Sequence, residues 1–222
     1  MYLKAGPLVI GVDENGFGAL AGPLVVTAAA CTAEQNRVGI PCRDSKRYGR
    51  AAMPSRIKRD QLNGHVNFLT GRMQTDINNS RFICYHIVEV SPDKLCRWGY
   101  QASLGYAFRL AVASVRYALR PHFPTAIIDG VIDHGVPLSR ALAKADDKWP
   151  IVSLASCLGK TRQLQRMHEL HELYPQYGFH TNHGYGVATH IAAIKQFGLT
   201  PHHRERIITK MDGMHSLPRY TP

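Results

Sequence analysis

The chain has 222 residues, with 27 Lys and Arg against 16 Asp and Glu, so its formal net charge is +11 while its 12 histidines are neutral. Hydrophobic residues at 45% and charged residues at 19% are typical of a globular protein and exclude a disordered one. The longest apolar stretch, residues 19–31, is well short of the roughly 20 residues of a membrane span. The positive charge favours a polyanionic partner, and nucleic acid is the commonest one.

The cysteines number five, are scattered along the chain and include no C-x-x-C pair. This pattern is typical of reduced thiols in a cytoplasm. Internal repeats and long linkers are absent from the sequence. We therefore expect a cytoplasmic monomer without a membrane partner, folded as a single domain over residues 1–222.

Three strand signals occur in the first 90 residues. Residues 8–12 and 23–30 are short apolar runs on either side of a glycine-rich turn. Residues 81–90 alternate between two faces, which predicts a third strand. Further on, the apolar residues 126–128 predict a short buried strand that ends at Asp129-Gly130.

Helix signals dominate the rest of the chain. Ser91-Pro92 is a good capping pair for a long helix, which carries an apolar stripe at spacings of three and four residues. The stripe consists of Leu104, Phe108, Ala111, Val115 and Leu119. A second long helix is predicted from Pro150, and a third over residues 187–197, stopped by Gly198. These patterns predict an α/β or α+β domain with a central sheet and a helical C-terminal part, from about residue 165 to 222.

Carboxylates stand at three places where chemistry is commonly found. Asp13-Glu14 directly follows the first strand, Asp129 ends a later one, and Asp146-Asp147 precedes a helix. Taken singly, Asp129-Gly130 fits a turn, and Asp146 or Asp147 an N-cap. Together, on a strongly basic chain, they indicate a site for divalent metal ions, because Mg²⁺ prefers carboxylate oxygens and paired ions serve phosphodiester hydrolysis.

Several motifs resemble ribonuclease HII (type 2 ribonuclease H), at about that family's spacing and over almost the whole chain. The similarity opens at residues 11–18 (GVDENGFG) and continues through Asp44-Ser45-Lys46, Asp129-Gly130 and Asp146. It ends with the following motifs in order: Ala155-Ser156, Lys160, residues 174–179 (YPQYGF), Gly184-Tyr185, His190 and His203-Arg204. The resemblance implies a ribonuclease H-like fold with a central mixed sheet flanked by helices.

The resemblance also implies an activity: endonucleolytic cleavage of RNA within an RNA–DNA hybrid duplex, with Mg²⁺ or Mn²⁺, leaving 3′-hydroxyl and 5′-phosphate ends. The residues implied as catalytic and metal-binding are Asp13, Glu14, Asp129 and Asp146. Those implied as nucleic-acid-binding are Gly16, Phe17, Gly18, Ser45, Lys46, Lys160, Tyr185 and Arg204. Tyr185 would stack near the deoxyribose that follows the ribonucleotide. A replication clamp is a protein partner that the resemblance leaves open.

Three positions depart from the family pattern. Phe17 replaces the usual arginine of the glycine turn, His183 a lysine, and Gln163 an acidic residue. A phenyl ring offers neither charge nor hydrogen-bond donors, so we expect catalysis to persist and the preference for single embedded ribonucleotides to be weak. The alternative is a nucleic-acid-binding protein with the same fold and little or no turnover.

Two further patterns bear on nucleic-acid binding. Residues 43–59 contain seven basic residues against one acidic residue, which is equally typical of a phosphate-tracking edge and of a solvated helix. Eight histidines follow residue 167, and if they line the groove they should strengthen binding at mildly acid pH.

Overall fold

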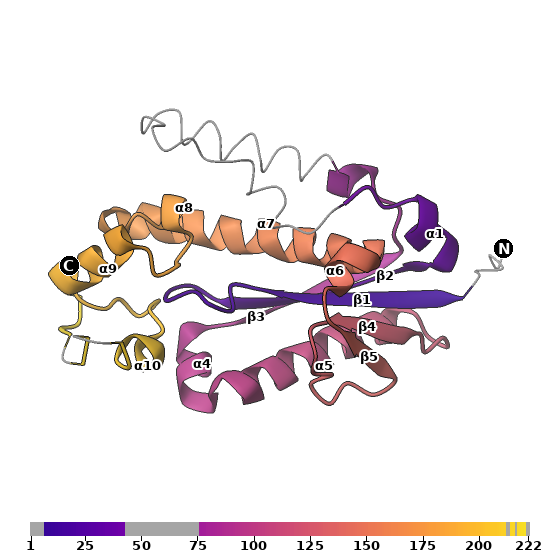
Figure 1. Ribbon diagram of the computed structural model, residues 1–222, viewed down its shortest axis with the longest axis horizontal. Helices are drawn as coiled ribbons and strands as arrows, with labels where there is room; N and C mark the ends of the chain where they lie inside the picture. Colours follow the sequence, from indigo (N-terminus) through magenta and orange to yellow (C-terminus); the bar gives the residue numbers. More distant parts are fainter. Residues whose placement is uncertain (1–6, 43–75, 212–213, 216, 221–222) are drawn as a thin grey trace.

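The computed structural model describes residues 7–42, 76–211, 214–215 and 217–220. Within them, the central element is a five-stranded sheet in the order β3-β2-β1-β4-β5 (Figure 1). Its strands are β1 (Leu8–Asn15), β2 (Leu24–Thr32), β3 (Cys84–Val90), β4 (Thr125–Asp129) and β5 (Ser139–Leu142). β1 pairs antiparallel with β2 and parallel with β4, so the expected mixed sheet is confirmed. Ser45, Lys46 and the basic segment 43–59 lie outside the described residues.

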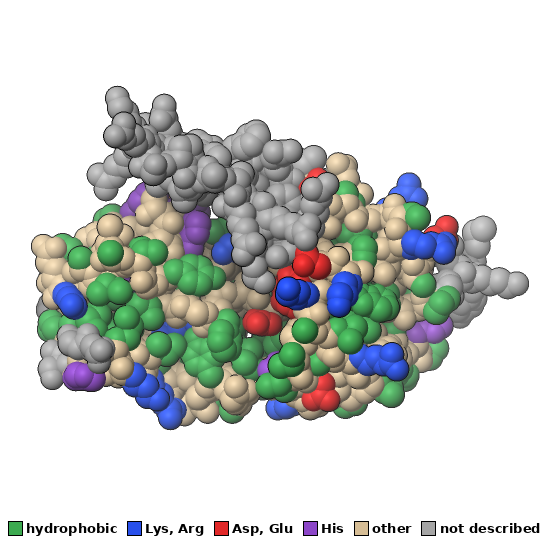
Figure 2. Space-filling model, in the orientation of Figure 1, with side chains coloured by type: hydrophobic (Ala, Val, Ile, Leu, Met, Phe, Trp, Pro, Cys, Tyr) green, Lys and Arg blue, Asp and Glu red, His purple; other side chains and the backbone are tan. Residues whose placement is uncertain are grey.

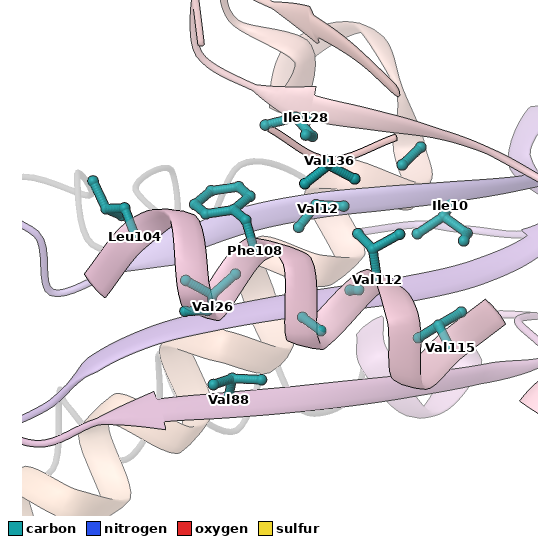
Figure 3. Close-up of a cluster of buried hydrophobic side chains, with 14 of the residues drawn as sticks. Ile10, Val12, Val26, Val88, Leu104, Phe108, Val112, Val115, Ile128 and Val136 are labelled. Atoms are coloured by element: carbon teal, nitrogen blue, oxygen red, sulfur yellow. The ribbon is translucent and has the colours of Figure 1, made fainter. Parts of the chain in front are cut away.

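The helix α5 (Tyr100–Ala118) covers one face of the sheet. Its stripe packs on Ile10, Val12 and Ile128, the side chains that β1 and β4 direct to this face (Figure 3). All five residues of the predicted stripe are buried in this cluster. The apolar spacing therefore predicted correctly which side of the helix meets the sheet.

The helix α7 (Pro150–Leu173) covers the opposite face. A Cβ atom added to Gly11 would lie 2.6 Å from the backbone of Ile151 and of Val152, so the first turn of α7 rests almost directly on β1. The side chain of Asn15 donates to the carbonyl of Ser156 at 3.2 Å, farther along the same helix. Odd-numbered positions of β1 thus face α7 and even-numbered ones face α5.

Smaller helices complete the fold, and several were not expected from the sequence. The predicted long helix after Ser91 is interrupted at Gly99, which has φ 81° and ψ 164° and separates α4 (Pro92–Trp98) from α5. The remaining helices are α1 (Ala33–Val38), α6 (Ala145–Lys148), a 3₁₀ turn (Pro175–Tyr177), α8 (Phe179–Asn182), α9 (Ala188–Phe197) and α10 (Glu205–Ile208).

The C-terminal segments enclose a separate apolar cluster against the far end of α7, at the left of Figure 1. Leu20, Met167, Tyr177, Phe179 and Ile194 are among its buried members. Leu20 belongs to the turn between β1 and β2, so this cluster joins the C-terminal part to the site-bearing edge of the sheet. Across the described ranges, none of the helices is both long and apolar enough to cross a membrane.

Candidate active site

Three of the four predicted catalytic carboxylates lie at one edge of the sheet. Asp13 and Asp129 come one position after Val12 and Ile128, the last residues that pair β1 with β4 in parallel, so both lie where the pairing of these two strands ends. The Oδ1 atom of Asp129 accepts a hydrogen bond from the backbone N–H of Ala145 at 2.7 Å. This bond fixes the start of α6, and the next residue is Asp146. Three segments that are far apart in sequence are thereby joined at one place.

Burial distinguishes these carboxylates from ordinary surface groups. Asp13 is 3% exposed and Asp146 is 5% exposed. An anionic group at such depth is tolerated only with compensating donors or cations. Figure 2 shows acidic side chains gathered near the middle of one face, with basic side chains beside them.

Glu14 is placed differently from the three aspartates. It follows Asp13 on β1 and pairs in register with Val26 of β2. Because successive strand residues point to opposite faces, its side chain starts from the α5 side of the sheet, whereas Asp13 faces α7. Glu14 is half-buried at the strand end, where the chain turns away.

The donor chemistry of this edge fits a hard divalent cation, since Mg²⁺ and Mn²⁺ prefer carboxylate oxygens. The side chains are not closed around one: among the described residues, no group of three or more His, Cys, Asp or Glu side chains is arranged to hold a metal ion.

The glycine turn that follows β1 is held by a buried arginine. Arg204 donates from Nη1 to the carbonyls of Gly16 at 2.7 Å and Phe17 at 3.1 Å, and from Nε to that of Gly22 at 2.9 Å. The hydroxyl of Tyr100 hydrogen-bonds with Arg204 and donates to the Phe17 carbonyl at 2.7 Å. Both side chains thus fix the backbone of the turn, which needs Gly16 at φ 79°.

This arrangement corrects the prediction for Arg204. The side chain is 0% exposed and its Nε and Nη1 atoms are taken up by carbonyls of the turn, so it is not the exposed nucleic-acid contact that was predicted. It acts on the site through the turn that it positions. Tyr100 was missed altogether, because a tyrosine 83 positions from its partner Phe17 carries no local sequence signal.

Phe17 and Gly18 form the exposed tip of the turn. The ring of Phe17 is 49% exposed and meets the ring of Tyr100 edge to face, at 5.1 Å between centroids. A Cβ atom added to Gly18 would find nothing within 4 Å. The tip therefore presents an aromatic ring and open space to whatever approaches the aspartates.

Tyr185 lies beside the same turn. The carbonyl of Gly184 accepts from the N–H groups of Leu20 at 2.7 Å and Ala21 at 3.2 Å. A Cβ atom at Gly184 would come within 2.4 Å of the Ala21 carbonyl, so the contact requires glycine. The Nζ atom of Lys160 lies 5.5 Å from the centroid of the Tyr185 ring. Two predicted nucleic-acid-binding residues, Lys160 and Tyr185, are thus brought together with the turn.

Lys160 is paired with an uncharged partner. Its Nζ donates to Oε1 of Gln163 at 2.8 Å, and burial lowers the pKa of Lys160 to about 8. The Nε2 atom of Gln163 is buried without a hydrogen-bond partner in the described part of the chain, close to Gly16. Burial, followed by the charge of Lys160, lowers the pKa of His183 to about 4.

Comparisons with known proteins point to one family. The family model described as Ribonuclease HII matches residues 130–212. The ribonuclease HII of Thiobacillus denitrificans is 33% identical over 205 residues, covering 91% of this chain and 88% of that protein. That of Chlamydia abortus is 31% identical over 199 residues, with 89% and 82% covered.

Solved structures show the same fold. The ribonuclease H2 of Pyrococcus horikoshii matches with a TM-score of 0.62 at 23% identity, covering 90% of this chain and 93% of that one. The RNase HII of Archaeoglobus fulgidus, solved in a complex with PCNA, matches with a TM-score of 0.62 at 21% identity, covering 92% and 95%.

The mixed sheet flanked by α5 and α7, shared with these solved structures, defines a protein with the ribonuclease H-like fold. The ribonuclease HII relatives are more than 30% identical to this chain over most of both chains, which narrows the class to one family. The chain belongs to the ribonuclease HII family, and so to the nucleases among the hydrolases.

Proposed function

We propose that this protein is a metal-dependent endoribonuclease that hydrolyses the RNA strand of RNA–DNA hybrids and leaves 3′-hydroxyl and 5′-phosphate ends. The observation that carries the proposal is the placement of Asp13, Asp129 and Asp146 at one edge of the sheet. Family membership supports the substrate, and the net charge of +11 supports a polyanionic one.

Asp13, Glu14, Asp129 and Asp146 would hold Mg²⁺ or Mn²⁺. When bound, such an ion supplies an activated water and stabilises the oxygen that leaves the phosphodiester. The carboxylates would not act as nucleophiles; their role would be to hold the metal ions in position. Asp129 is already oriented by the Ala145 N–H, which holds the α6 segment at the ends of β1 and β4.

The other residues would bind and orient the substrate. The open space at Gly18 admits a strand close to the backbone of the turn. Lys160 carries a positive charge toward that strand, and Tyr185 offers a ring face for a sugar. Only the 2′-hydroxyl distinguishes RNA from DNA at a single position, so the sensor belongs beside the aspartates. Ser45 and Lys46 keep their proposed role through the sequence motif alone.

Phe17 limits the recognition of isolated ribonucleotides. Its ring meets that of Tyr100 edge to face and supplies no donor, so the turn would recognise a 2′-hydroxyl through backbone groups only. We therefore expect the protein to cleave tracts of several ribonucleotides faster than single embedded ribonucleotides. The protein acts as a monomer in the cytoplasm, and the PCNA complex of the Archaeoglobus fulgidus relative supports a replication clamp as a candidate partner.

The test is a cleavage assay on two labelled duplexes, one with a four-ribonucleotide tract and one with a single ribonucleotide. We expect cutting of the tract with Mg²⁺ or Mn²⁺, none with chelator, and a loss of at least about a hundredfold in kcat for Asp146→Asn, which removes a charge at a site where charge is positioned. The single ribonucleotide should be cut less well. Equal cutting of both duplexes would overturn the role given to Phe17.

A second candidate is a hybrid-binding protein with little turnover, favoured by Phe17 and Gln163, which stand where the family pattern has an arginine and an acidic residue. It predicts tight, strongly salt-dependent binding without cutting in any metal. Circular dichroism of Asp146→Asn, matched to that of the wild type, excludes misfolding as the cause of lost activity.

A further inference from the structure

A cavity of about 300 Å³ lies behind the glycine turn, between the α4–α5 junction and α10. Figure 1 shows α10 beside α4. The cavity is lined by Gly99, Tyr100, Arg204, Arg206 and Lys210, together with apolar side chains. Arg204 and Tyr100, which hydrogen-bond to the backbone of the glycine turn, also line this cavity.

The charged residues of this cavity are all cationic: Arg204, Arg206 and Lys210 line it, and none of its lining residues is acidic. The nearby Glu205 is engaged by Arg219 at 2.6 Å. In Figure 2 this end of the visible face shows Lys and Arg side chains. An anion entering the cavity would therefore meet positive charge without a competing lining carboxylate.

Arg204 has a donor to spare. Its Nε and Nη1 atoms serve the turn, while Nη2 is buried and has no hydrogen-bond partner in the described part of the chain. An unsatisfied buried donor on a charged group is unfavourable, and a small anion is the partner that removes the penalty most fully. Arg204 is 0% exposed, and this burial lowers the pKa of its guanidinium.

The amino end of α5 opens into the same place. α5 has 19 residues and begins after Gly99, which has no side chain with which to cap it. The Nη1 atom of Arg206 lies 3.6 Å from where a Cβ of Gly99 would be, so the guanidinium stands over the helix start. Helix amino ends attract phosphate groups through free N–H groups and the helix dipole.

We propose that this cavity binds a phosphate group of the hybrid's backbone, held by Arg206, Lys210 and the amino end of α5. The inference rests on the proposed function and adds to it a subsite for the substrate. Because Arg204 touches both the cavity and the turn, a phosphate seated there would also fix the turn that carries Phe17. The chemistry is that of a phosphate mono- or dianion, so free inorganic phosphate is the other source to be distinguished.

The experiment measures binding of an uncut hybrid in chelator, as a function of salt. The variants are Arg206→Met, Lys210→Met and their combination, and the control is Lys195→Met, an exposed lysine on α9. Loss of one phosphate contact should reduce the slope of log K against log salt by about 0.9. Because both side chains would hold the same phosphate, we expect that reduction for the combined variant, a partial one for each single variant, and the smallest for the control.

A second arm locates the phosphate. In a series of hybrids, a single phosphate is replaced by a neutral methylphosphonate at each position in turn. The wild type should bind one member of the series several-fold more weakly than the others. In the double variant, the replacement at that position should no longer weaken binding. The proposal would be overturned by salt slopes equal to that of Lys195→Met. It would also be overturned if the same methylphosphonate position weakened binding in the double variant as in the wild type. Calorimetric binding of inorganic phosphate to the wild type, with that unchanged pattern, would overturn the assignment to the hybrid.

Failure of the subsite is distinguishable from failure of the proposed function. If the subsite is wrong, the wild type still cuts the ribonucleotide tract while the variants bind like the control. If the function is wrong, no cutting occurs with Mg²⁺ or Mn²⁺ although the cavity variants still weaken binding.

Discussion

Single residues at the site differ in how far the sequence reveals them. The placement of Asp13 and Asp129 on the sheet was predictable, because each carboxylate ends an apolar run that reads as a strand, and Asp129 directly precedes a glycine. The burial of Arg204 was not, because its neighbours in the sequence are charged and its partner Gly16 lies 188 positions away. Gln163 was visible as a departure from the family pattern, but its hydrogen bond with Lys160 was not.

Lys160 gives a prediction at this scale. With a pKa of about 8, its cation is present below that pH and is lost as the pH rises through it, so hybrid binding should weaken between pH 7 and 9. Gln163→Glu places a carboxylate beside Nζ, raises the pKa of Lys160 and should move this weakening to higher pH. The measurement is hybrid affinity against pH in chelator. Lys160→Met is the control, in which the weakening should vanish; its persistence there would assign it to another group.

At the scale of elements, patterns of apolar residues predicted the main strands and helices because each buries one regular face. They did not reveal β5, which is short and has no apolar alternation, or the break at Gly99, across which the chain remains helical in composition. β1 extends to Asn15, past the charged pair, because β2 supplies hydrogen-bond partners along its whole length. The site sits on that extension, so it depends on how β1 packs.

The contact between β1 and α7 leads to the next prediction. In Gly11→Ala the new methyl group must displace the backbone of α7, which should lower the free energy of unfolding by about 1–3 kcal/mol. Since α6 and Asp146 directly precede α7, the same displacement should reduce cleavage. Gly18→Ala is the matched control for stability, because its methyl group meets open space. Urea unfolding compares the two variants. Equal free energies of unfolding would contradict the prediction, because α7 would then move to make room for the methyl group without loss of stability.

At the scale of the whole molecule, the histidines of the C-terminal part stabilise the fold in their neutral forms. His203 accepts at Nδ1 from the N–H of Thr200 at 3.0 Å, so its Nε2 carries the proton toward Nε2 of His190 at 3.2 Å. His190 in turn donates from Nδ1 to the carbonyl of Tyr185 at 2.9 Å. A proton added to either ring would place two donors face to face. Burial lowers the pKa of both His190 and His203, so these two do not supply the positive charge that was expected to strengthen binding in mild acid.

The consequence is a fold that acid weakens. Burial lowers the pKa of His203 to about 3 and that of His183 to about 4, both below the value of about 6.5 in an unfolded chain. Above pH 7 neither state binds these protons, so the free energy of unfolding is unaffected. As the pH falls from 6.5 toward 4, these histidines bind protons in the unfolded chain and stay neutral in the folded one. The free energy of unfolding should therefore fall by up to about 1.4 kcal/mol per pH unit for each histidine. Urea unfolding at a series of pH values measures the slope, and His203→Asn should make it shallower. A slope identical in that variant would show that other groups cause the loss.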